Sequence, residues 1–208
     1  MAFIRKHQFK IAVLALCVAM GIYLLISMQD KTTVTFESNE PAPEFTLSDL
    51  DGNPVKLSDS NGKARVVYFY YANCPDVCPP TTFLMSELQN ELKADGTFGK
   101  DVEFISITFD PVRDTPDAIR SFIDKIPNEI DQTGWKFLRG DDEQATAKLM
   151  TDFGMMVVKD PETGLYSHSD LITFIDRDGN IRKYVRGSMD ELVSADKLKE
   201  ITDALIDL

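Results

Sequence analysis

The sequence is poor in the residue types that most often build metal sites and covalent crosslinks. Its 208 residues include only three cysteines and two histidines. So few cysteines exclude a scaffold built on disulfides, and a closed structural zinc site usually needs four cysteine or histidine ligands. Any sulfur or imidazole chemistry is therefore confined to a few positions: Cys17, Cys74, Cys78, His7 and His168.

The chain also lacks an excess of positive charge. It has 22 Lys and Arg residues against 34 Asp and Glu residues, a net charge of −12. An acidic surface repels the phosphate backbone, which argues against nucleic acid as a partner. The same acidity could attract a cationic partner or a metal ion, but most of these carboxylates are expected simply to keep the surface solvated.

One segment, residues 11–28, is almost wholly apolar. It is just long enough to cross a bilayer, and Arg5, Lys6 and Lys10 precede it. Positive charge before the run places residues 1–10 in the cytoplasm and the rest of the chain outside. We predict a single-pass transmembrane anchor in a bacterial cytoplasmic membrane, since no Arg-rich, Ser-rich transit peptide is present. A cleaved signal peptide and lipidation of Cys17 are the alternatives.

The rest of the chain divides into a short tether and one domain. Residues 29–43 are polar, without periodicity and rich in proline at their end, as in a linker. Residues 44–208 have the size of a single domain. We therefore predict that the functional part begins near residue 44 and continues to the end.

Within that domain, strand and helix patterns alternate. The predicted strands cover residues 44–47, 55–57, 66–71, 102–108, 135–138, 155–158, 171–175 and 181–185. The predicted helices cover residues 80–95, 116–126, 141–153 and 189–206. A strand, a helix and a strand at this spacing form a parallel, right-handed crossover, whereas the last strands form a hairpin. This order predicts an α/β fold of the thioredoxin type, with a central mixed sheet flanked by helices.

Two cysteines follow the most apolar strand. Cys74 and Cys78 lie between the strand at 66–71 and a helix expected to start at Pro80. The first turn of a helix offers free N–H groups and a positive dipole end, which stabilise a thiolate. The spacing permits either a disulfide or two thiolates on one metal ion. Cysteines so placed are seldom inert core residues.

This stretch resembles the signature of the Sco (SenC) family. Tyr68-Phe69-Tyr70 and the hexapeptide from Cys74 to Pro79 carry the resemblance. It continues at 45–49, 51–52, 110–116, 168–169 and 176–179, and it covers the chain from about Pro43 onward. The resemblance implies a thioredoxin-like copper protein that assists assembly of the binuclear copper site of cytochrome c oxidase.

The resemblance also implies a metal site formed by Cys74, Cys78 and His168. Thioredoxin-like oxidoreductases place a cis-proline opposite their cysteines, yet no proline lies between Pro161 and the strand at Leu171. A histidine in that neighbourhood makes a Cys-Cys-His site plausible. Two thiolates suit Cu(I), and an added imidazole can also hold Cu(II). Copper is therefore the expected metal.

The family resemblance implies a chaperone, not an enzyme in the strict sense. Its expected partners are apo cytochrome c oxidase subunit II or a similar copper protein, and a copper donor or thiol reductant. The alternative is a dedicated thiol-disulfide oxidoreductase in which Cys74 attacks and Cys78 resolves the mixed disulfide. A thiol peroxidase would use Thr81 or Thr82 beside one cysteine, but it also needs an arginine that the sequence does not identify.

Other residues have two readings. Asp110 and Asp114 match an acidic pair of the family and could assist copper or a partner, although a turn and a helix start explain them equally well. Met85, Met155 and Met156 are soft copper donors in principle, but packing is the simpler explanation. Their roles stay open at this point.

Overall fold

The computed structural model describes residues 2–29, 34–187 and 193–208. The chain forms two compact units, Met1–Thr35 and Phe36–Leu208. Helix α1 (Ala2–Gln29) belongs to the first unit. Among the described residues, no helix has the combination of length and hydropathy that crossing a bilayer requires. The transmembrane part of the prediction is thus not confirmed.

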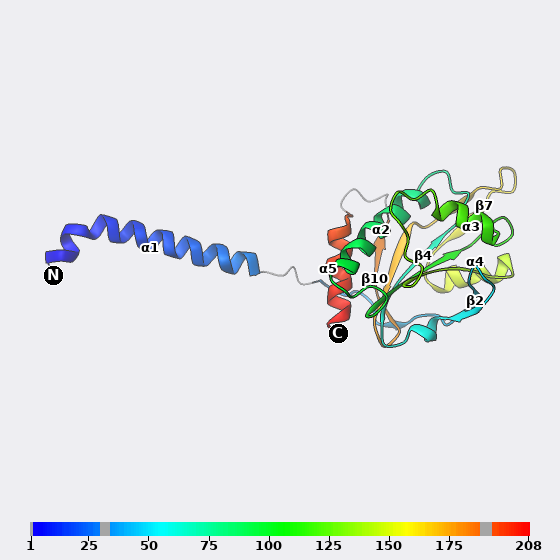
Figure 1. The fold of residues 1–208 in the computed structure, drawn as a ribbon, viewed down its shortest axis with the longest axis horizontal. Helices are drawn as coiled ribbons and strands as arrows, with labels where there is room; N and C mark the ends of the chain where they lie inside the picture. Colours follow the sequence, from blue (N-terminus) through cyan, green and yellow to red (C-terminus); the bar gives the residue numbers. More distant parts are fainter. Residues whose placement is uncertain (1, 30–33, 188–192) are drawn as a thin grey trace. The chain divides into compact units, whose positions relative to one another are not determined.

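The second unit is built on an eight-stranded mixed sheet with the strand order β1-β10-β9-β4-β5-β6-β2-β3 (Figure 1). Its strands are β1 (Glu40–Pro41), β2 (Thr46–Ser48), β3 (Pro54–Lys56), β4 (Ala64–Tyr70), β5 (Val102–Thr108), β6 (Trp135–Arg139), β9 (Leu171–Ile175) and β10 (Asn180–Arg186). Strands β7 (Val157–Lys159) and β8 (Tyr166–His168) form a separate antiparallel pair. The predicted mixed sheet is confirmed.

Strand β4 is the centre of the sheet. It runs parallel to β5 and antiparallel to β9, and all of its residues are buried. Burial on both faces explains why its sequence is a nearly continuous apolar and aromatic run. Because β4 points its carboxyl end in the same direction as β5, the segments that follow both strands meet at one edge of the sheet.

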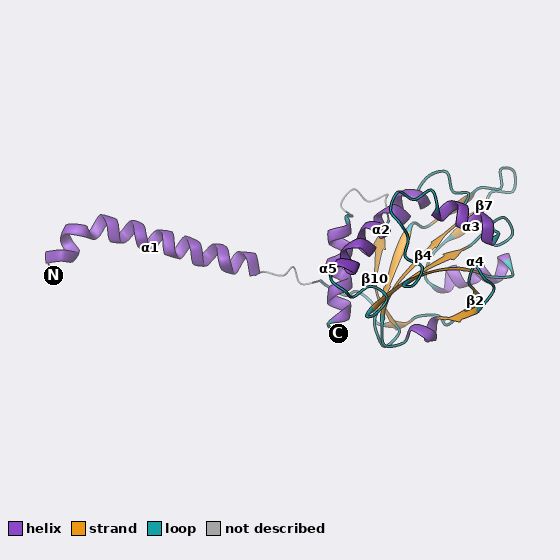
Figure 2. Ribbon diagram, in the orientation of Figure 1, coloured by secondary structure: helices purple, strands orange, loops and turns teal. Residues whose placement is uncertain are grey.

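Helices cover both faces of the sheet (Figure 2). They are α2 (Cys78–Ala94), α3 (Pro116–Ile123), α4 (Glu143–Asp152) and α5 (Ala195–Ile206), with a short 3₁₀ helix over Leu57–Ser60. Helices α2 and α5 pack against each other. The Tyr68 side chain donates to Asp170, which Thr81 of α2 also contacts. The next side chain along the strand, Phe69, packs edge-on against Phe153, the residue that follows α4. Neighbouring strand residues point to opposite faces, so α4 covers the face opposite α2.

Two helix starts differ from the prediction. Helix α2 begins at Cys78, not Pro80. Residues in the first turn of a helix donate no intrahelical hydrogen bond, so the missing N–H groups of Pro79 and Pro80 do not prevent this earlier start. The first hydrogen bond of the helix runs from the Thr81 amide to the Val77 carbonyl at 3.1 Å. Helix α5 begins after Ser194, whose hydroxyl accepts a hydrogen bond from the Lys197 amide at 3.2 Å. Residues 189–192 of that predicted helix lie outside the described residues.

The sheet also begins earlier than expected. Residues Glu40 and Pro41 form β1 and pair with the start of β10, and the Ala42 amide donates to the Gly179 carbonyl at 2.9 Å. The end of the segment predicted as a tether is therefore an edge strand. A strand of two residues is too short to show the alternation of apolar and polar residues by which strands are recognised. Its proline is tolerated because the strand lies at the edge of the sheet.

Arg65 joins the start of β4 to the turn between β9 and β10. Its side chain is only 1% exposed. The guanidinium donates to the carbonyls of Lys63 (2.8 Å) and Asp176 (2.7 Å) and to Oδ1 of Asn61 (3.0 Å). These bonds, made by the two terminal nitrogens, compensate much of the cost of burying the charge, although Nε has no partner among the described residues. The contact fixes the end of the sheet that is remote from the cysteines.

Candidate metal centre

The two cysteines lie where β4 passes into α2. The Cys74 amide closes a tight turn by donating to the Tyr71 carbonyl at 3.2 Å. Cys78 is the first residue of α2, and its amide donates to Sγ of Cys74 at 3.4 Å. Both side chains are buried, and neither forms a disulfide. The start of the helix therefore directs an N–H group at the Cys74 sulfur, which favours its thiolate.

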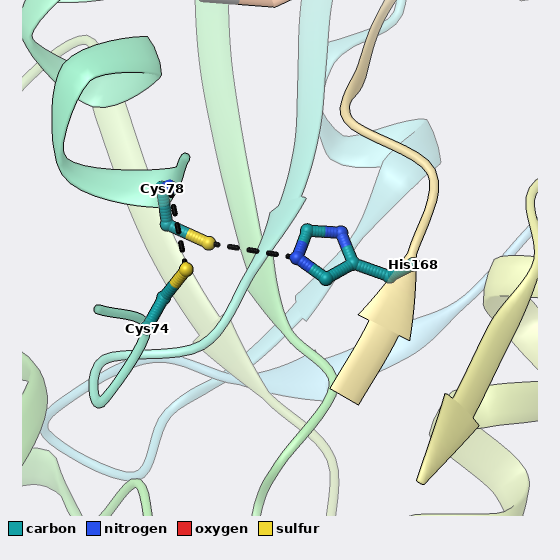
Figure 3. A group of neighbouring side chains, drawn as sticks. All are labelled: Cys74, Cys78 and His168. Carbon is teal, nitrogen blue, oxygen red and sulfur yellow. Dashed lines mark hydrogen bonds between the residues drawn. The ribbon is translucent and has the colours of Figure 1, made fainter. Parts of the chain in front are cut away.

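His168 ends strand β8 and faces the cysteines across the site (Figure 3). Its Nδ1 lies 3.0 Å from the carbonyl oxygen of Ser169, and its Nε2 lies 4.0 Å from Sγ of Cys78. A carbonyl can only accept, so Nδ1 carries the hydrogen in the neutral ring and Nε2 presents its lone pair to the sulfurs. This is the orientation that a metal-binding histidine needs.

The structure brings together all three residues that the sequence predicted as ligands. One donor atom from each of Cys74, Cys78 and His168 lies within 4.8 Å of the other two. Donors around a tetrahedral ion at about 2.0–2.3 Å are roughly 3.3–3.8 Å apart. Small side-chain rotations could therefore close the group around one ion.

The two sulfurs differ in acidity. The hydrogen bond from Cys78 lowers the pKa of Cys74 to about 4, against the effect of burial, and His168 and nearby amides contribute in the same direction. Burial raises the pKa of Cys78 far above its usual range, and Cys74 adds to this. Burial opposes a charged imidazole at His168, but contacts with Cys74 and the Ser169 carbonyl raise its pKa overall. The pair thus combines one thiolate, Cys74, with one thiol, Cys78.

Polar side chains of β4, α2 and the segment after β8 lie near the sulfurs, and of these the sequence had singled out only Thr81. Tyr68 donates to Oδ1 of Asp170 at 3.0 Å, and Thr81 lies 3.2 Å from both oxygens of that carboxylate. Burial raises the pKa of Tyr68 and of Tyr71, and the nearby Cys78 and Cys74, respectively, add to this. The available signal was the presence of hydroxylated aromatics, rather than phenylalanine, at the end of a buried strand.

Tyr166 connects the β7–β8 pair that carries His168 to other parts of the domain. Its hydroxyl donates to Oε1 of Glu143 at 2.7 Å and lies 3.2 Å from Oδ1 of Asp110. Its ring lies between the cations of Lys159 and Arg113, at 5.2 and 5.5 Å from the centroid. Cation–π contacts and a charged hydrogen bond thus position the histidine strand.

The acidic pair Asp110 and Asp114 is fully buried beside the cysteine turn. Asp110 forms an ion pair with Arg113. Asp114 accepts hydrogen bonds from the Ala72 amide (2.8 Å) and from the Thr108 hydroxyl. Burial raises the pKa of Asp114 to about 6 although both bonds favour its charged form. Neither carboxylate belongs to the three-residue group. Asp114 instead stabilises the turn that carries the cysteines, through its hydrogen bond with the Ala72 amide.

Asp114 should make stability depend on pH. Its folded pKa, about 6, exceeds the ordinary value of 3.8, so its stabilising effect is complete below pH 3.8 and is lost as pH rises through 6. The loss is about 3 kcal/mol. In urea unfolding between pH 4 and 7.5, Asp114→Asn should gain about that much relative to wild type.

Asp131 provides the matched control for that measurement. The hydrogen bond from Lys93 lowers the pKa of Asp131 to about 2. Asp131→Asn should therefore lose stability relative to wild type as pH rises from 2 to 5, the opposite sign. A constant difference between Asp114→Asn and wild type across the pH range would contradict the assignment.

The methionines and Cys17 lie outside the cluster. Met85 and Met155 are buried in the core, as expected for packing residues. Met156 is 74% exposed, and its backbone pairs with Ser169. Cys17 is an exposed residue of α1. Within the described residues there is no cis peptide bond, which agrees with the missing cis-proline.

The fold and the cluster define a thioredoxin-like α/β protein with two cysteines and one histidine that could hold a metal ion. The SCO1/SenC family model matches residues 34–203. The chain therefore belongs to the SCO1/SenC family.

Known relatives and solved structures agree with this assignment. The SCO1 protein homolog of Bacillus subtilis is 30% identical over 150 residues, which cover 72% of this chain and 75% of the relative. The structure of BsSco, described as having a disulfide switch and as a member of the Sco family of cytochrome c oxidase assembly proteins, is 27% identical with a TM-score of 0.71, covering 85% of this chain and 99% of that one. Copper-bound ScoI of Bradyrhizobium japonicum is 27% identical with a TM-score of 0.64, covering 79% and 99%.

Proposed function

We propose that this chain binds one copper ion as cargo through Cys74, Cys78 and His168. The observation that carries the proposal is the convergence of two sulfurs and one imidazole nitrogen within 4.8 Å. Soft thiolates select Cu(I), and imidazole suits both copper oxidation states. Zinc is less well matched, because three ligands would leave an open position with no hydrolytic group identified beside it. A copper-bound relative with the same fold supports the choice of metal.

We also propose that the copper is passed to an apo copper protein during assembly of cytochrome c oxidase, with subunit II or a similar protein as the acceptor. The description of BsSco as an oxidase assembly protein supports this role. Three ligands from two separate parts of the fold can be exchanged one at a time for those of an acceptor. The chain would then act as a chaperone and not as an enzyme.

Titration of the reduced full-length protein with Cu(I) and Cu(II) tests the site. We expect one tight equivalent and a thiolate-to-Cu(II) charge-transfer band. His168→Ala should lose at least about tenfold in Cu(II) affinity, because an imidazole stabilises the cupric state, while its Cu(I) affinity falls less since both thiolates remain. Competition with chelators of known affinity measures both constants.

His7 supplies the matched control for this experiment, because it is the other histidine of the chain and lies in α1. His7→Ala should bind copper as wild type does. Equal copper affinity in the His168→Ala and wild-type proteins would refute the three-ligand site.

A second function is favoured by one observation: Cys74 and Cys78 are free, adjacent and of different acidity. Such a pair could reduce a disulfide in a partner's copper site, with Cys74 as the attacking thiolate and Cys78 as the resolving thiol. The partner's disulfide would gain two electrons as this pair is oxidised to a disulfide. Copper binding indifferent to His168, together with Cys74-dependent reduction of a disulfide-bonded peptide, would favour this function over copper transfer.

Attachment to a bacterial cytoplasmic membrane is a separate proposal that rests on the sequence. The apolar run at 11–28 and the preceding basic residues support an N-terminus in the cytoplasm and a domain on the outer face. Resistance of the full-length chain to alkaline extraction from membranes, lost on deletion of residues 1–28, would support it.

A further inference from the structure

One buried carboxylate connects the parts of the chain that carry the proposed copper ligands. Asp170 lies two residues after His168, between β8 and β9, and is only 7% exposed. Its Oδ1 accepts a hydrogen bond from the Tyr68 hydroxyl at 3.0 Å. The Thr81 hydroxyl lies 3.2 Å from each of the two carboxylate oxygens and donates to them. Tyr68 and Thr81 are fully buried, so these hydrogen bonds are shielded from water.

The two hydroxyl groups come from the elements that position the cysteines. Tyr68 belongs to β4, the strand that leads into the turn of Cys74. Thr81 lies three residues after Cys78 in α2, so the two side chains share one side of that helix. The carboxylate itself is on the segment that follows the histidine strand. Asp170 therefore links all three ligand-bearing segments within a few residues of the ligands.

Gly187, the residue after β10, approaches the carboxylate so closely that no side chain fits. Its amide donates to the Asp170 carbonyl at 3.0 Å. A Cβ at this position would lie 2.5 Å from Oγ1 of Thr81 and 2.6 and 2.7 Å from the carboxylate oxygens of Asp170. Glycine permits such a close approach of the backbone. The carboxylate and the hydroxyl are thus confined on this side by the main chain.

We propose that Asp170 is a positioning residue of the copper site, holding His168 and Cys78 at the separation from which they close around the ion. This inference rests on the proposed copper function. Hydrogen bonds to a carboxylate are strong and directional, so the bond from Thr81 restrains α2 relative to the histidine segment. The resulting distance between Nε2 of His168 and Sγ of Cys78 is 4.0 Å (Figure 3). A site arranged before its ion arrives loses less conformational entropy on binding.

Thr81→Val keeps the charge of Asp170 but removes one tie between α2 and the histidine segment. We expect the Cu(II) affinity to fall about tenfold, the lower end of the range for groups that orient a metal ligand. The Cu(I) affinity should fall less, because the two thiolates remain. The thiolate-to-Cu(II) charge-transfer band should also change, since the imidazole meets the ion in a different geometry. Thr81→Ser retains the hydroxyl and should behave as wild type.

Two further variants separate the position of the carboxylate from its charge. Gly187→Ala keeps every hydrogen-bonding group and the charge, but its methyl group displaces Asp170 and Thr81. It should therefore reproduce the loss of Cu(II) affinity expected of Thr81→Val. Asp170→Asn removes the charge and keeps one oxygen that can accept from both hydroxyls. Its effect should be smaller than that of Gly187→Ala.

The chain offers a matched control for each kind of change. Thr202 is a fully buried threonine of α5 whose hydroxyl donates to the Leu198 carbonyl of the same helix at 2.8 Å. Gly134 precedes β6, at the edge of the sheet opposite the cysteines, and a Cβ there would lie 2.6 Å from a ring carbon of Phe98. Thr202→Val and Gly134→Ala should therefore leave copper affinity and spectrum unchanged.

NMR of the metal-free protein adds a readout that does not depend on copper. The chain has only two histidines, His7 and His168, so few imidazole signals need to be assigned. The His168 signals should shift in Thr81→Val and Gly187→Ala, because the ring moves relative to the sulfurs and to the Phe109 ring, whose centroid lies 4.9 Å away. The His7 signals should stay in place. Circular dichroism establishes that each variant is folded.

Affinities and spectra are compared in the reduced full-length wild-type protein and its variants. Weaker Cu(II) binding and shifted His168 signals in Thr81→Val and Gly187→Ala, absent from both controls, support the proposal. Wild-type affinity and spectrum in these two variants, or a loss confined to Asp170→Asn, overturn it, because the carboxylate would then act only through its charge or only on the fold. Equal losses in the controls overturn it as well. If the wild-type protein binds no copper, the proposed function itself fails.

Discussion

Replacement of Cys78 by serine should lower Cu(I) affinity by more than about a hundredfold, the largest effect we expect at the site. Loss of a residue that only supports a ligand costs about 10–100-fold, and Cys78 would be a ligand itself. A serine hydroxyl remains protonated and is a hard donor, so it cannot replace a soft thiolate on Cu(I). The buried location of Cys78 also prevents water from taking its place easily.

Competition with a Cu(I) chelator, in the reduced full-length protein, measures this loss. Cys17→Ser is the matched control, since it removes the same thiol from an exposed position of α1. It should keep the single tight site. Retention of wild-type affinity by Cys78→Ser would place the copper elsewhere and would leave Cys78 to redox chemistry alone.

Arg65→Met should destabilise the domain by several kcal/mol, because it removes hydrogen bonds from a charged donor that contribute roughly 1.5–3 kcal/mol each. The substitution keeps a long side chain but withdraws the donors that serve Lys63, Asp176 and Asn61. Their oxygens would be buried with fewer hydrogen bonds. The start of β4 would then separate more easily from the β9–β10 turn.

Urea unfolding at constant pH provides the measurement. Arg120→Met is the control, because Arg120 forms its ion pairs with Asp51 and Asp117 at the surface. Such exposed pairs contribute little, so this variant should lose less than about 1 kcal/mol. If the two variants lost equal stability, the buried hydrogen bonds of Arg65 would have no special importance.

The parts of the fold that could be predicted have a strong local pattern. Strands β4 and β5 are long buried runs of apolar and β-branched residues, and this composition alone predicts a central strand. The sequence Thr115-Pro116 also predicted the start of α3. The structure confirms it: the Thr115 side chain accepts a hydrogen bond from the Ala118 amide at 3.2 Å, and Pro116 is the first residue of the helix. Local propensity and tertiary structure agree at these positions.

The β7–β8 pair could be predicted only in part. An extended piece at 155–158 was expected, but β8 was not, since each strand has three residues and neither is fully buried. Tyr166 of β8 is held by hydrogen-bond contacts with Glu143 and Asp110, which lie on other segments of the chain. Contacts of this kind leave no periodic pattern.

For the site, the identity of the cluster was accessible and its surroundings were not. Cys74 and Cys78 follow from one motif, and His168 from the resemblance and the missing proline. The contacts of Asp170 with Tyr68 and Thr81 depend on which side chains meet when β4, α2 and β9 assemble. A tyrosine in a buried strand is most simply a core residue, and only the tertiary structure reveals where its hydroxyl lies.

The separate β7–β8 pair has a mechanical consequence. The two sulfurs lie at the junction of β4 and α2, whereas the imidazole lies on the separate β7–β8 pair, which contacts α4 through Tyr166 and Lys159. A bound ion would thus crosslink the cysteine turn to the β7–β8 pair, joining Cys78 to His168, which are 90 positions apart in the sequence. An acceptor that displaced the β7–β8 pair would remove the His168 ligand and leave the two cysteine ligands in place. Copper would thus be released one ligand at a time. Substitutions at Glu143 or Lys159, which do not touch the metal site, would change the copper affinity by loosening the β7–β8 pair.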